Sequence, residues 1–386
     1  MNTGSTPYLD FGLEPEHLTF REQFRRFVRE QIDPIADEAE AKGEFPREVY
    51  GTLSRHGYLG VNFPEGIGGG GDLLMGCIFY EELTRASAGI SAGVFAHQHL
   101  ATGPVLKFGT EAQKSEFAYP AARGERIGAF GLTEPDAGSD IRGIRSRARE
   151  VGGNWVINGS KLYITNGGIA DFIVVAARTG DDRRSDSLTL FLVDTRNKGV
   201  NASELRKVGN HSSSTAFISF EDVEIAPDYV LGSVGQGLHQ LKATLTEGRI
   251  LVANRGLGIG QEACECILRY ARERSAFGQP IAKFQAIAFK VAEMATRCDA
   301  ARLMIYRAAR LKMAGEDCIR EASMAKFMAS ELAVQAATSS LLLHGGAGYM
   351  EEMKVARLFR DAPEAWIGEG TNEIQLLVIS KALGLL

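Results

Sequence analysis

The N-terminal third of the chain carries its apolar residues at helical spacing. The first stripe starts near Leu18 and consists of Phe20, Phe24, Phe27 and Val28. We expect Pro34 to end this helix, because proline cannot continue the hydrogen-bonding pattern. Further helices are predicted over residues 45–57, 73–85 and 90–108. The pattern therefore predicts an N-terminal α-helical domain over residues 1–124.

The apolar period changes to two in the middle of the chain, which is typical of strands. Strands are predicted over residues 126–132, 142–151, 172–178, 187–193 and 216–225. Within residues 155–164, the dipeptide Asn158-Gly159 is a strong signal for a hairpin turn. We therefore expect a middle antiparallel β domain over residues 125–236, either a small barrel or a sandwich.

The C-terminal part returns to long helical patterns, over residues 238–275, 280–314, 316–344 and 373–383. Long helices joined by short connections predict a four-helix bundle over residues 237–386. The fold class expected from the pattern is α+β, with a helical domain, a β domain and a helical bundle in that order.

Composition narrows the class of protein. The 386 residues are 45% hydrophobic and 24% charged, as in an ordinary globular protein. The net charge of −5, with no basic block, argues against nucleic acid or an anionic membrane as a partner. Residues 1–18 lack the apolar run of a secretory signal, and no run is long enough to span a bilayer. Five cysteines without metal-ligand spacing fit free thiols in a reducing cytoplasm.

A short turn precedes the last predicted helix, in the sequence Trp366-Ile-Gly-Glu-Gly-Thr-Asn-Glu-Ile-Gln375. Glu369 lies between two glycines, which allow unusual backbone angles and close approach of a ligand. Thr371 or Asn372 can cap the helix, and Glu373 suits the positive end of its dipole. These features fit a carboxylate base beside an anion-binding helix start. They fit a plain capped turn as well.

Other local motifs in the sequence give weaker indications of function. The glycine-rich stretches 66–71 and 256–260 lack the preceding strand that a phosphate or dinucleotide site requires. We expect the first to be a loop and the second a site of close helix packing. His97 and His99 are two residues apart, on different faces of a helix, so we expect no shared metal. No hydrolase or zinc-protease motif is present, and no metal site is predicted.

Five segments of the chain form a distinctive set. They are Phe130-Gly-Leu-Thr-Glu-Pro-Asp-Ala-Gly-Ser-Asp140, Tyr163-Ile-Thr-Asn-Gly-Gly168, Glu273-Arg-Ser-Ala-Phe-Gly-Gln-Pro280, His344-Gly-Gly-Ala-Gly-Tyr349 and Glu369-Gly-Thr-Asn-Glu-Ile374. In sequence, order and spacing they resemble the signature segments of the acyl-CoA dehydrogenase family. The resemblance runs from about Leu18 to the end of the chain.

The resemblance implies an FAD enzyme, usually a homotetramer with a dimer as the alternative, that removes two hydrogens from Cα and Cβ of an acyl thioester. The isoalloxazine ring would be held by Phe130, Leu132, Thr133, Gly138, Ser139, Tyr163 and Thr165. A neighbouring subunit's FAD would be reached through its adenosine diphosphate part by Arg274, Phe277 and Gln285. Gly345, Gly346, Thr371 and Glu373 would complete the cofactor site. Arg249, Ser139 and Gly370 would contact substrate, and Glu369 matches the family's catalytic base.

The chemistry agrees with that assignment. A thioester α-proton is weakly acidic, so the enolate that forms needs hydrogen bonds at its carbonyl oxygen. Binding of an apolar thioester expels water, which raises the pKa of a carboxylate and makes it a stronger base. Some relatives carry the base on the first bundle helix, where this chain has Gly248. Glu247 is adjacent and is kept as the alternative base, although a helical side chain one residue away should face elsewhere.

Several positions depart from the family pattern. Gly368 stands where many relatives have tyrosine, which predicts a wider or differently shaped pocket, and Leu342 removes one polar FAD contact. Residues 210–214 differ from the usual loop near the pantetheine arm. Glu316 and Asp317 stand where some relatives place arginines near the CoA nucleotide, and acidic residues do not favour its phosphates. Phe95, Gln98 and Thr102 are candidates for the floor of the acyl pocket.

These departures leave alternatives open. The substrate could be an acyl-CoA, or an acyl or aminoacyl group on a carrier protein, which needs no nucleotide clamp. A catalytically idle flavoprotein acting as an interaction partner, and an oxidase that reduces oxygen, are the other hypotheses. The resemblance names an electron-transfer flavoprotein as the expected acceptor.

Overall fold

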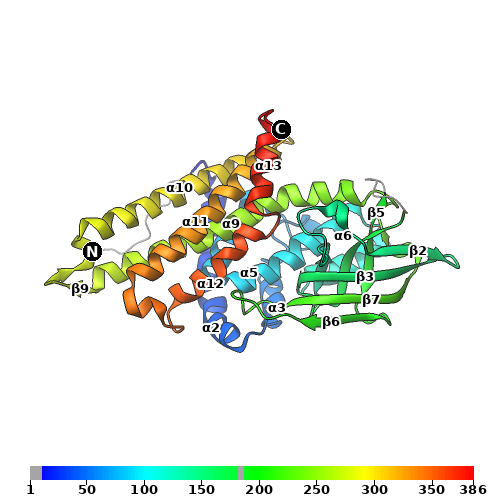
Figure 1. Ribbon diagram of the computed structural model, residues 1–386, viewed down its shortest axis with the longest axis horizontal. Helices are drawn as coiled ribbons and strands as arrows, with labels where there is room; N and C mark the ends of the chain where they lie inside the picture. Colours follow the sequence, from blue (N-terminus) through cyan, green and yellow to red (C-terminus); the bar gives the residue numbers. More distant parts are fainter. Residues whose placement is uncertain (1–10, 181–186) are drawn as a thin grey trace.

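The computed structural model describes residues 11–180 and 187–386, which form a helical region, a β-sheet and a bundle of long helices (Figure 1). Residues 1–10, part of the stretch searched for a signal, and 181–186 lie outside the described residues. The fold class expected from the sequence is confirmed. Among the described residues, no helix is both long and apolar enough to cross a membrane.

The N-terminal region is helical, as expected, but its first break is misplaced. The helix continues through Pro34, because a π-helical turn accommodates the proline at the start of the next segment. The elements are α1 (Pro15–Phe27), η1 (Val28–Ile32), α2 (Asp33–Lys42), α3 (Glu48–Arg55), η2 (Glu65–Ile67), α4 (Leu73–Ala86), α5 (Ala88–Phe95), η3 (Ala96–Thr102), α6 (Gly103–Phe108), α7 (Glu111–Gln113), η4 (Lys114–Ala118) and α8 (Tyr119–Ala122).

The middle region is one sheet in the order β6-β7-β3-β2-β4-β5-β8, with β1 also pairing to β4. Most pairs are antiparallel, whereas β1 and β2 run parallel to β4. The strands are β1 (Gly128–Gly131), β2 (Arg147–Val151), β3 (Asn154–Thr165), β4 (Phe172–Arg178), β5 (Leu188–Asp194), β6 (Val200–Glu204), β7 (Thr215–Ile225) and β8 (Val230–Leu231), with short helices η5 (Ile141–Gly143) and η7 (Pro227–Tyr229). Side chains of β4 alternate between two apolar clusters, one on each face of the sheet.

The hairpin predicted at Asn158-Gly159 is wrong. Both residues lie inside the continuous strand β3, where the ladder to β7 has an irregularity. The turn is instead Gly152-Gly153, which joins β2 to β3, and both glycines have positive φ. The side chain of Asn158 exchanges hydrogen bonds with Asp222 on β7, so it stabilises a strand pair and not a turn.

The C-terminal helices form the predicted bundle, which packs against the N-terminal helices around one shared apolar core. The elements are α9 (Gly237–Glu273), β9 (Ser275–Ala276), β10 (Gln279–Pro280), η8 (Ile281–Lys283), α10 (Gln285–Met313), α11 (Ile319–Leu343), η9 (Gly345–Tyr349), α12 (Lys354–Ile367) and α13 (Asn372–Ala382). We keep 1–124, 125–236 and 237–386 as a proposed division into domains.

Two glycines of α9 show why its glycine-rich stretch is a packing site, as expected. A Cβ on Gly256 would lie 2.8 Å from the carbonyl oxygen of Ala329 on α11. A Cβ on Gly258 would lie 2.6 Å from the carbonyl oxygen of Glu81 on α4. Neither neighbour can move easily because both are backbone atoms, so α9 needs glycine where it crosses them. The five cysteines are free and buried, as predicted.

Candidate active site

Side chains of α11 hold the turn between α12 and α13 in place. The ammonium of Lys326 donates to the carbonyl oxygen of Trp366 over 2.8 Å and to Oδ1 of Asn372 over 3.2 Å. Ser330 also donates to Asn372 Oδ1, and Thr371 caps α13 by accepting from the N–H of Ile374. The buried Lys326 thus fixes both ends of the turn that carries Glu369.

The backbone of the turn adopts an unusual conformation at its centre. Glu369 has φ of +56° and Gly370 has φ of +89°. A left-handed glutamate is uncommon and occurs where the surroundings enforce it. Here Nε2 of Gln375 donates to the carbonyl oxygens of both residues, at 3.2 and 2.9 Å. Among the described residues, the N–H of Glu369 donates to no other backbone group.

The carboxylate of Glu369 is buried against the first bundle helix. Its Oε2 lies 2.9 Å from the place where a Cβ on Gly248 would be, so a larger residue there would displace the carboxylate from this position. This oxygen is buried and has no hydrogen-bond partner among the described residues. Burial raises the pKa of Glu369 to about 7, and the nearby Arg249 opposes that rise only in part. A carboxyl group with this pKa can accept a proton near neutral pH.

Arg249 and Glu247, the two neighbours of Gly248, have different surroundings. Burial lowers the pKa of Arg249 and Glu369 raises it, and Nε of Arg249 is buried without a partner among the described residues. Glu247 faces the ring of His99, with its Oε1 3.8 Å from Nδ1. The helix therefore turns Glu247 towards His99, as expected for a residue next to Gly248.

The β domain brings together the two segments expected at the isoalloxazine ring. The N–H of Leu162 donates to the carbonyl oxygen of Thr133 over 2.9 Å, which joins residues 130–133 to residues 163–165. The buried Lys161 strengthens this junction through Glu134 Oε1 at 2.6 Å and the carbonyl oxygen of Leu132 at 3.2 Å. Phe130 is buried, Leu132, Thr133 and Thr165 are half-buried, and Tyr163, Gly138 and Ser139 are exposed.

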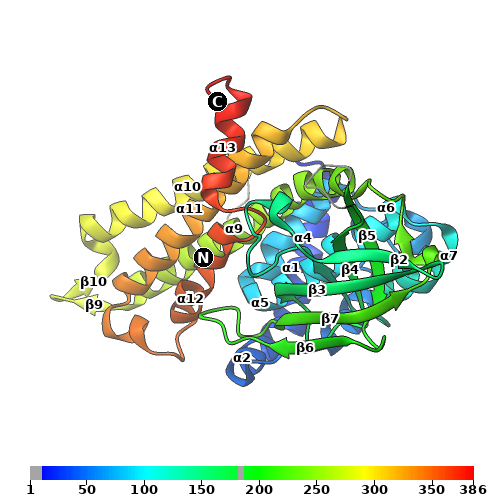
Figure 2. The same cartoon turned by 45° about the vertical axis from the view of Figure 1, so that its right-hand side comes forward.

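The remaining cofactor candidates lie elsewhere. Figures 1 and 2 show the β9–β10 connection at the end of the bundle opposite to the sheet. Arg274, Phe277 and Gln285 lie at that connection, Gly345 and Gly346 follow α11, and all five are exposed. A single chain therefore does not bring these residues to the Thr133–Tyr163 region. Thr371 and Glu373 stand beside Glu369, at the start of α13.

The departures from the family pattern have specific structural consequences. The space beside Gly368 is not empty, because a Cβ there would lie 2.6 Å from Oε1 of Glu364. That carboxylate pairs with Arg255 over 2.8 Å, so Glu364 occupies the space beside Gly368, and the predicted difference in pocket shape stays a prediction. Leu342 is exposed, as are Glu316 and Asp317.

The loop 210–214 is tied to the helical domains. The N–H of Asn210 donates to Asp361 on α12 over 2.6 Å, and the N–H of Ser212 donates to Glu40 on α2 over 3.0 Å. Burial, with the Glu40 carboxylate nearby, raises the pKa of Asp361 to about 7. The loop therefore joins the sheet to two helices through buried carboxyl groups.

The three residues predicted for the floor of the acyl pocket have different surroundings. Gln98 lines a cavity, but Phe95 is a core residue packed against Tyr80 and His99. The hydroxyl of Thr102 donates to the carbonyl oxygen of His97. Sequence reasoning did not assign roles to Lys326, Glu364 and His99, because their partners are distant in the chain, nor to Gln375, whose partners Glu369 and Gly370 are only five or six residues away.

Taken together, the described residues form a helical region, a sheet and a helical bundle, with a buried carboxylate on the turn between α12 and α13. Family models match the chain as acyl-CoA dehydrogenase N-terminal domain over residues 14–125, middle domain over 129–223 and C-terminal domain over 235–384. The chain belongs to the acyl-CoA dehydrogenase family. It is an oxidoreductase acting on a CH–CH bond, and its cofactor is FAD.

Individual relatives match over nearly the full length. The chain is 41% identical to an acyl-CoA dehydrogenase of Bacillus subtilis, over 95% of this chain and 98% of that protein. It is 38% identical to the caffeyl-CoA reductase–Etf complex subunit CarC of Acetobacterium woodii, over 95% and 98%. The structure of butyryl-CoA dehydrogenase from Megasphaera elsdenii superposes with a TM-score of 0.92 at 37% identity, covering 96% of this chain and 98% of that one.

The residues present fit FAD. Leu132, Thr133 and the exposed ring of Tyr163 supply an apolar and hydrogen-bonding face for a flavin ring. Arg274 is a suitable donor for a diphosphate, and Phe277, 96% exposed, offers a free aromatic face beside it. Nothing lies within 4 Å of a Cβ placed on Gly345 or Gly346, so a ligand can approach that backbone closely.

Proposed function

We propose that the chain oxidises an acyl-CoA thioester at Cα–Cβ with Glu369 as the catalytic base. The observation that carries this assignment is the buried, unpartnered Oε2 of Glu369, whose pKa is raised to about 7. A carboxylate used only to cap or pair would have a cationic or N–H partner at that atom. Glu247 is not proposed as the base, because its Oε1 faces His99.

The residues of the chain divide the work as follows. Glu369 takes the α-proton, and its left-handed backbone leaves its own N–H available to donate to the thioester carbonyl oxygen as negative charge develops there. Gly370 and Ser139 border the acyl thioester. Arg249, which lies beside Glu369, stabilises the anionic form of the base and the developing enolate. FAD, when bound, supplies the acceptor for the β-hydride.

The cofactor would be held by two sets of residues from different chains. Phe130, Leu132, Thr133, Gly138, Ser139, Tyr163 and Thr165 would contact the flavin ring of one FAD, with Thr371 and Glu373. Arg274, Phe277, Gln285, Gly345 and Gly346 would reach the adenosine diphosphate of a neighbour's FAD. The exposure of this second set supports an assembly of identical chains, for which we propose a homotetramer.

We propose an electron-transfer flavoprotein as the electron acceptor. The support is the similarity to a subunit of a caffeyl-CoA reductase–Etf complex. A carrier-protein thioester is the second substrate candidate, and the exposed Glu316 and Asp317 favour it, because they offer no cationic clamp for CoA phosphates.

The test is anaerobic reduction of the purified holoenzyme by a panel of acyl thioesters. Loss of the flavin's visible absorbance with at least one acyl-CoA is the expected result. The same acyl group is then offered on phosphopantetheinyl carrier protein, and a higher kcat/KM there would transfer the proposal to the second candidate. A flavoprotein that no thioester reduces would contradict both and favour an idle protein. Reoxidation in air as fast as with the acceptor flavoprotein would indicate an oxidase.

A further inference from the structure

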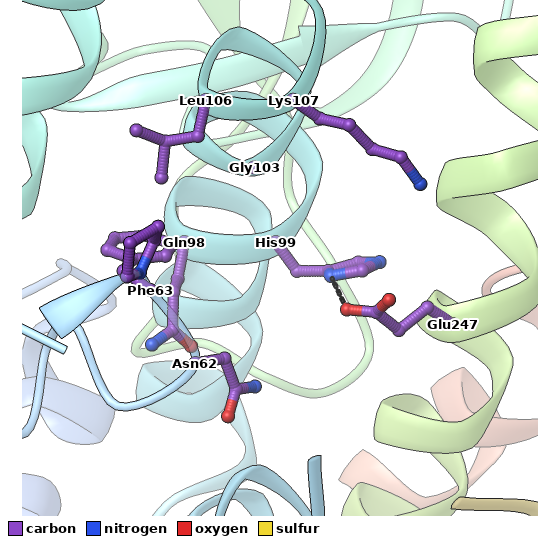
Figure 3. Close-up of a pocket in the computed structure, with 9 residues that line it drawn as sticks. Asn62, Phe63, Gln98, His99, Gly103, Leu106, Lys107 and Glu247 are labelled. Atoms are coloured by element: carbon purple, nitrogen blue, oxygen red, sulfur yellow. Dashed lines mark ion pairs between the residues drawn. The ribbon is translucent and has the colours of Figure 1, made fainter. Parts of the chain in front are cut away.

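A cavity of about 230 Å³ lies between the N-terminal helices and α9. Figure 3 shows His99 on η3 and Glu247 on α9 side by side, joined by a dashed line, and both line the cavity. Phe63 and Leu106 form part of the apolar wall, and Lys107 lies about two helical turns beyond His99. A cavity with apolar walls and few polar groups is typical of a site for a small organic group.

The hydrogen bonds of His99 determine which of its nitrogens can accept. Nε2 lies 3.0 Å from the carbonyl oxygen of Thr244, which can only accept, so Nε2 carries a hydrogen. Burial lowers the pKa of His99, against the opposing effect of Glu247, and this favours the neutral ring. In that neutral form, Nδ1 is an acceptor.

Two acceptors therefore face each other at the cavity. Nδ1 of His99 and Oε1 of Glu247 are 3.8 Å apart, longer than a direct hydrogen bond. Among the described residues, no side chain, including that of Asn62 on the cavity wall, donates a hydrogen bond to either of these two atoms. Gln98 uses its amide on the Tyr80 hydroxyl and on the Leu59 carbonyl oxygen.

Lys107 does not supply that donor either. It is exposed, and its ammonium lies 5.5 Å from the ring centre of Phe108. An amino group of a ligand has two or more N–H donors and would satisfy both acceptors, whereas a hydroxyl has one O–H and would satisfy one of them.

The pair is adjacent to the proposed base. A Cβ on Gly248 would lie 2.9 Å from Oε2 of Glu369 and 3.2 Å from Nε2 of His99. One edge of the His99 ring thus borders the same small space as the base, and the opposite edge carries Nδ1. Glu369 is not itself part of the cavity lining, so an acyl chain whose α-carbon is held at Glu369 would have to pass this ring edge for its distal end to reach the pair.

We propose that His99 and Glu247 form a specificity site that binds a hydroxyl or amino group on the distal part of the acyl chain. The proposal rests on the proposed function of Glu369. It predicts that the preferred substrate is a polar acyl thioester and not a simple alkyl one. A site built to bind a donor discriminates against an analogue that lacks it, because the buried His99 and the half-buried Glu247 would each lose a partner.

The experiment compares four CoA thioesters of similar length: pentanoyl, 5-hydroxypentanoyl, 5-aminopentanoyl and glutaryl. Anaerobic flavin reduction gives kcat/KM for each with the holoenzyme. We expect the hydroxy or amino compound to exceed pentanoyl-CoA about tenfold or more. Pentanoyl-CoA equal to or better than both, or glutaryl-CoA best of the four, would overturn the proposal, the latter because it requires a cationic site.

Two variants of one residue and a matched control make the test specific. E247Q and E247L are each expected to lower the ratio of hydroxy or amino over pentanoyl at least tenfold. K107M, on the same cavity, should leave the ratio unchanged. An unchanged ratio in both Glu247 variants, or an equal change in K107M, would refute the assignment. If no thioester reduces the wild-type flavin, the proposed function fails, whereas reduction by pentanoyl-CoA without selectivity defeats only this inference.

Discussion

Glu81 and Glu369 are two buried glutamates with opposite surroundings. Glu81, on α4, accepts from Arg302 over 2.8 Å and from Arg21 over 3.4 Å. Burial alone would raise the pKa of Glu81, but the two arginines outweigh it and hold the pKa at about 2. Burial raises the pKa of Glu369 to about 7, because Arg249 compensates only partly.

This difference in pairing and in pKa distinguishes a carboxylate that stabilises the fold from one that can accept a proton. Arg21, Glu81 and Arg302 come from α1, α4 and α10, so the cluster joins the N-terminal helices to the bundle. The carboxylate and guanidinium charges of this cluster are paired. Separating the N-terminal helices from the bundle would break these ion pairs and leave charges without their partners. Glu369 keeps Oε2 without a partner, which is unfavourable for stability but leaves it able to take a proton.

The largest expected effect is on catalysis at position 369. The E369Q variant should lose roughly 10²–10⁴-fold in the rate of anaerobic flavin reduction, the usual contribution of a general base. FAD should stay bound, as judged by the visible spectrum, because the amide is nearly the same shape. The control is E351Q, which changes an exposed glutamate of the same domain. A rate in E369Q within twofold of this control would make Glu369 a structural residue.

The next effect is on stability at Glu81. The E81A variant removes the buried carboxylate that Arg21 and Arg302 share, while Glu82 and Asp299 stay beside them. Breaking a buried ion pair typically costs about 3–5 kcal/mol in the free energy of unfolding. Chemical denaturation of the holoenzyme should show this loss, while the rate of flavin reduction per folded molecule changes little. An E81A protein that is as stable as the wild type would remove the contrast between the two sites.

A smaller effect is expected at the buried pair Lys161–Glu134, which fixes the two segments assigned to the flavin ring. The K161M variant leaves Glu134 buried and unpaired, and we expect about tenfold weaker FAD binding, or ~1.4 kcal/mol. The double variant K161M/E134Q should recover part of the affinity, because no unpaired charge remains. Titration of the apoprotein with FAD measures both, and equal affinity in all three proteins would contradict the assigned position of the ring.

The pH dependence should distinguish the two glutamates without mutation. The base acts in its deprotonated form, so kcat/KM should rise about tenfold per pH unit below about 7 and level off above it. The pKa of Glu369 is raised on folding, so its contribution to stability is greatest below pH 4.5 and is lost as the pH rises to about 7. The pKa of Glu81 is lowered, so its contribution is present at neutral pH and lost below pH 4.5. A flat kcat/KM profile between pH 5.5 and 8 would contradict the raised pKa.

Sequence patterns predicted the three-part fold because helical and strand periods are local properties of the chain. They failed at Asn158-Gly159 because a local turn signal competed with pairing to β7, and Asp222 on that distant strand decided the outcome. They failed at Pro34 because a π-helical turn relieved the clash that normally ends a helix.

The candidate base Glu369 could be identified from its neighbours in the sequence. The residues that surround it in space could not. The contact of Glu369 with Gly248 links residues more than 100 positions apart, and the Lys326–Trp366 bond is similarly non-local. The same holds for His99, whose partners Thr244 and Glu247 lie on α9. No period or motif within one segment encodes such pairs.

The central claim is that the Glu369 side chain removes a proton from the α-carbon. The most direct measurement is hydrogen exchange in D₂O with methylthioacetyl-CoA, whose β-position is sulfur and carries no hydrogen to transfer. Mass spectrometry follows deuterium incorporation at the α-carbon in the presence of wild-type or E369Q holoenzyme. We predict exchange with the wild type and only the protein-free rate with E369Q. Exchange at the wild-type rate with E369Q would show that another group takes the proton.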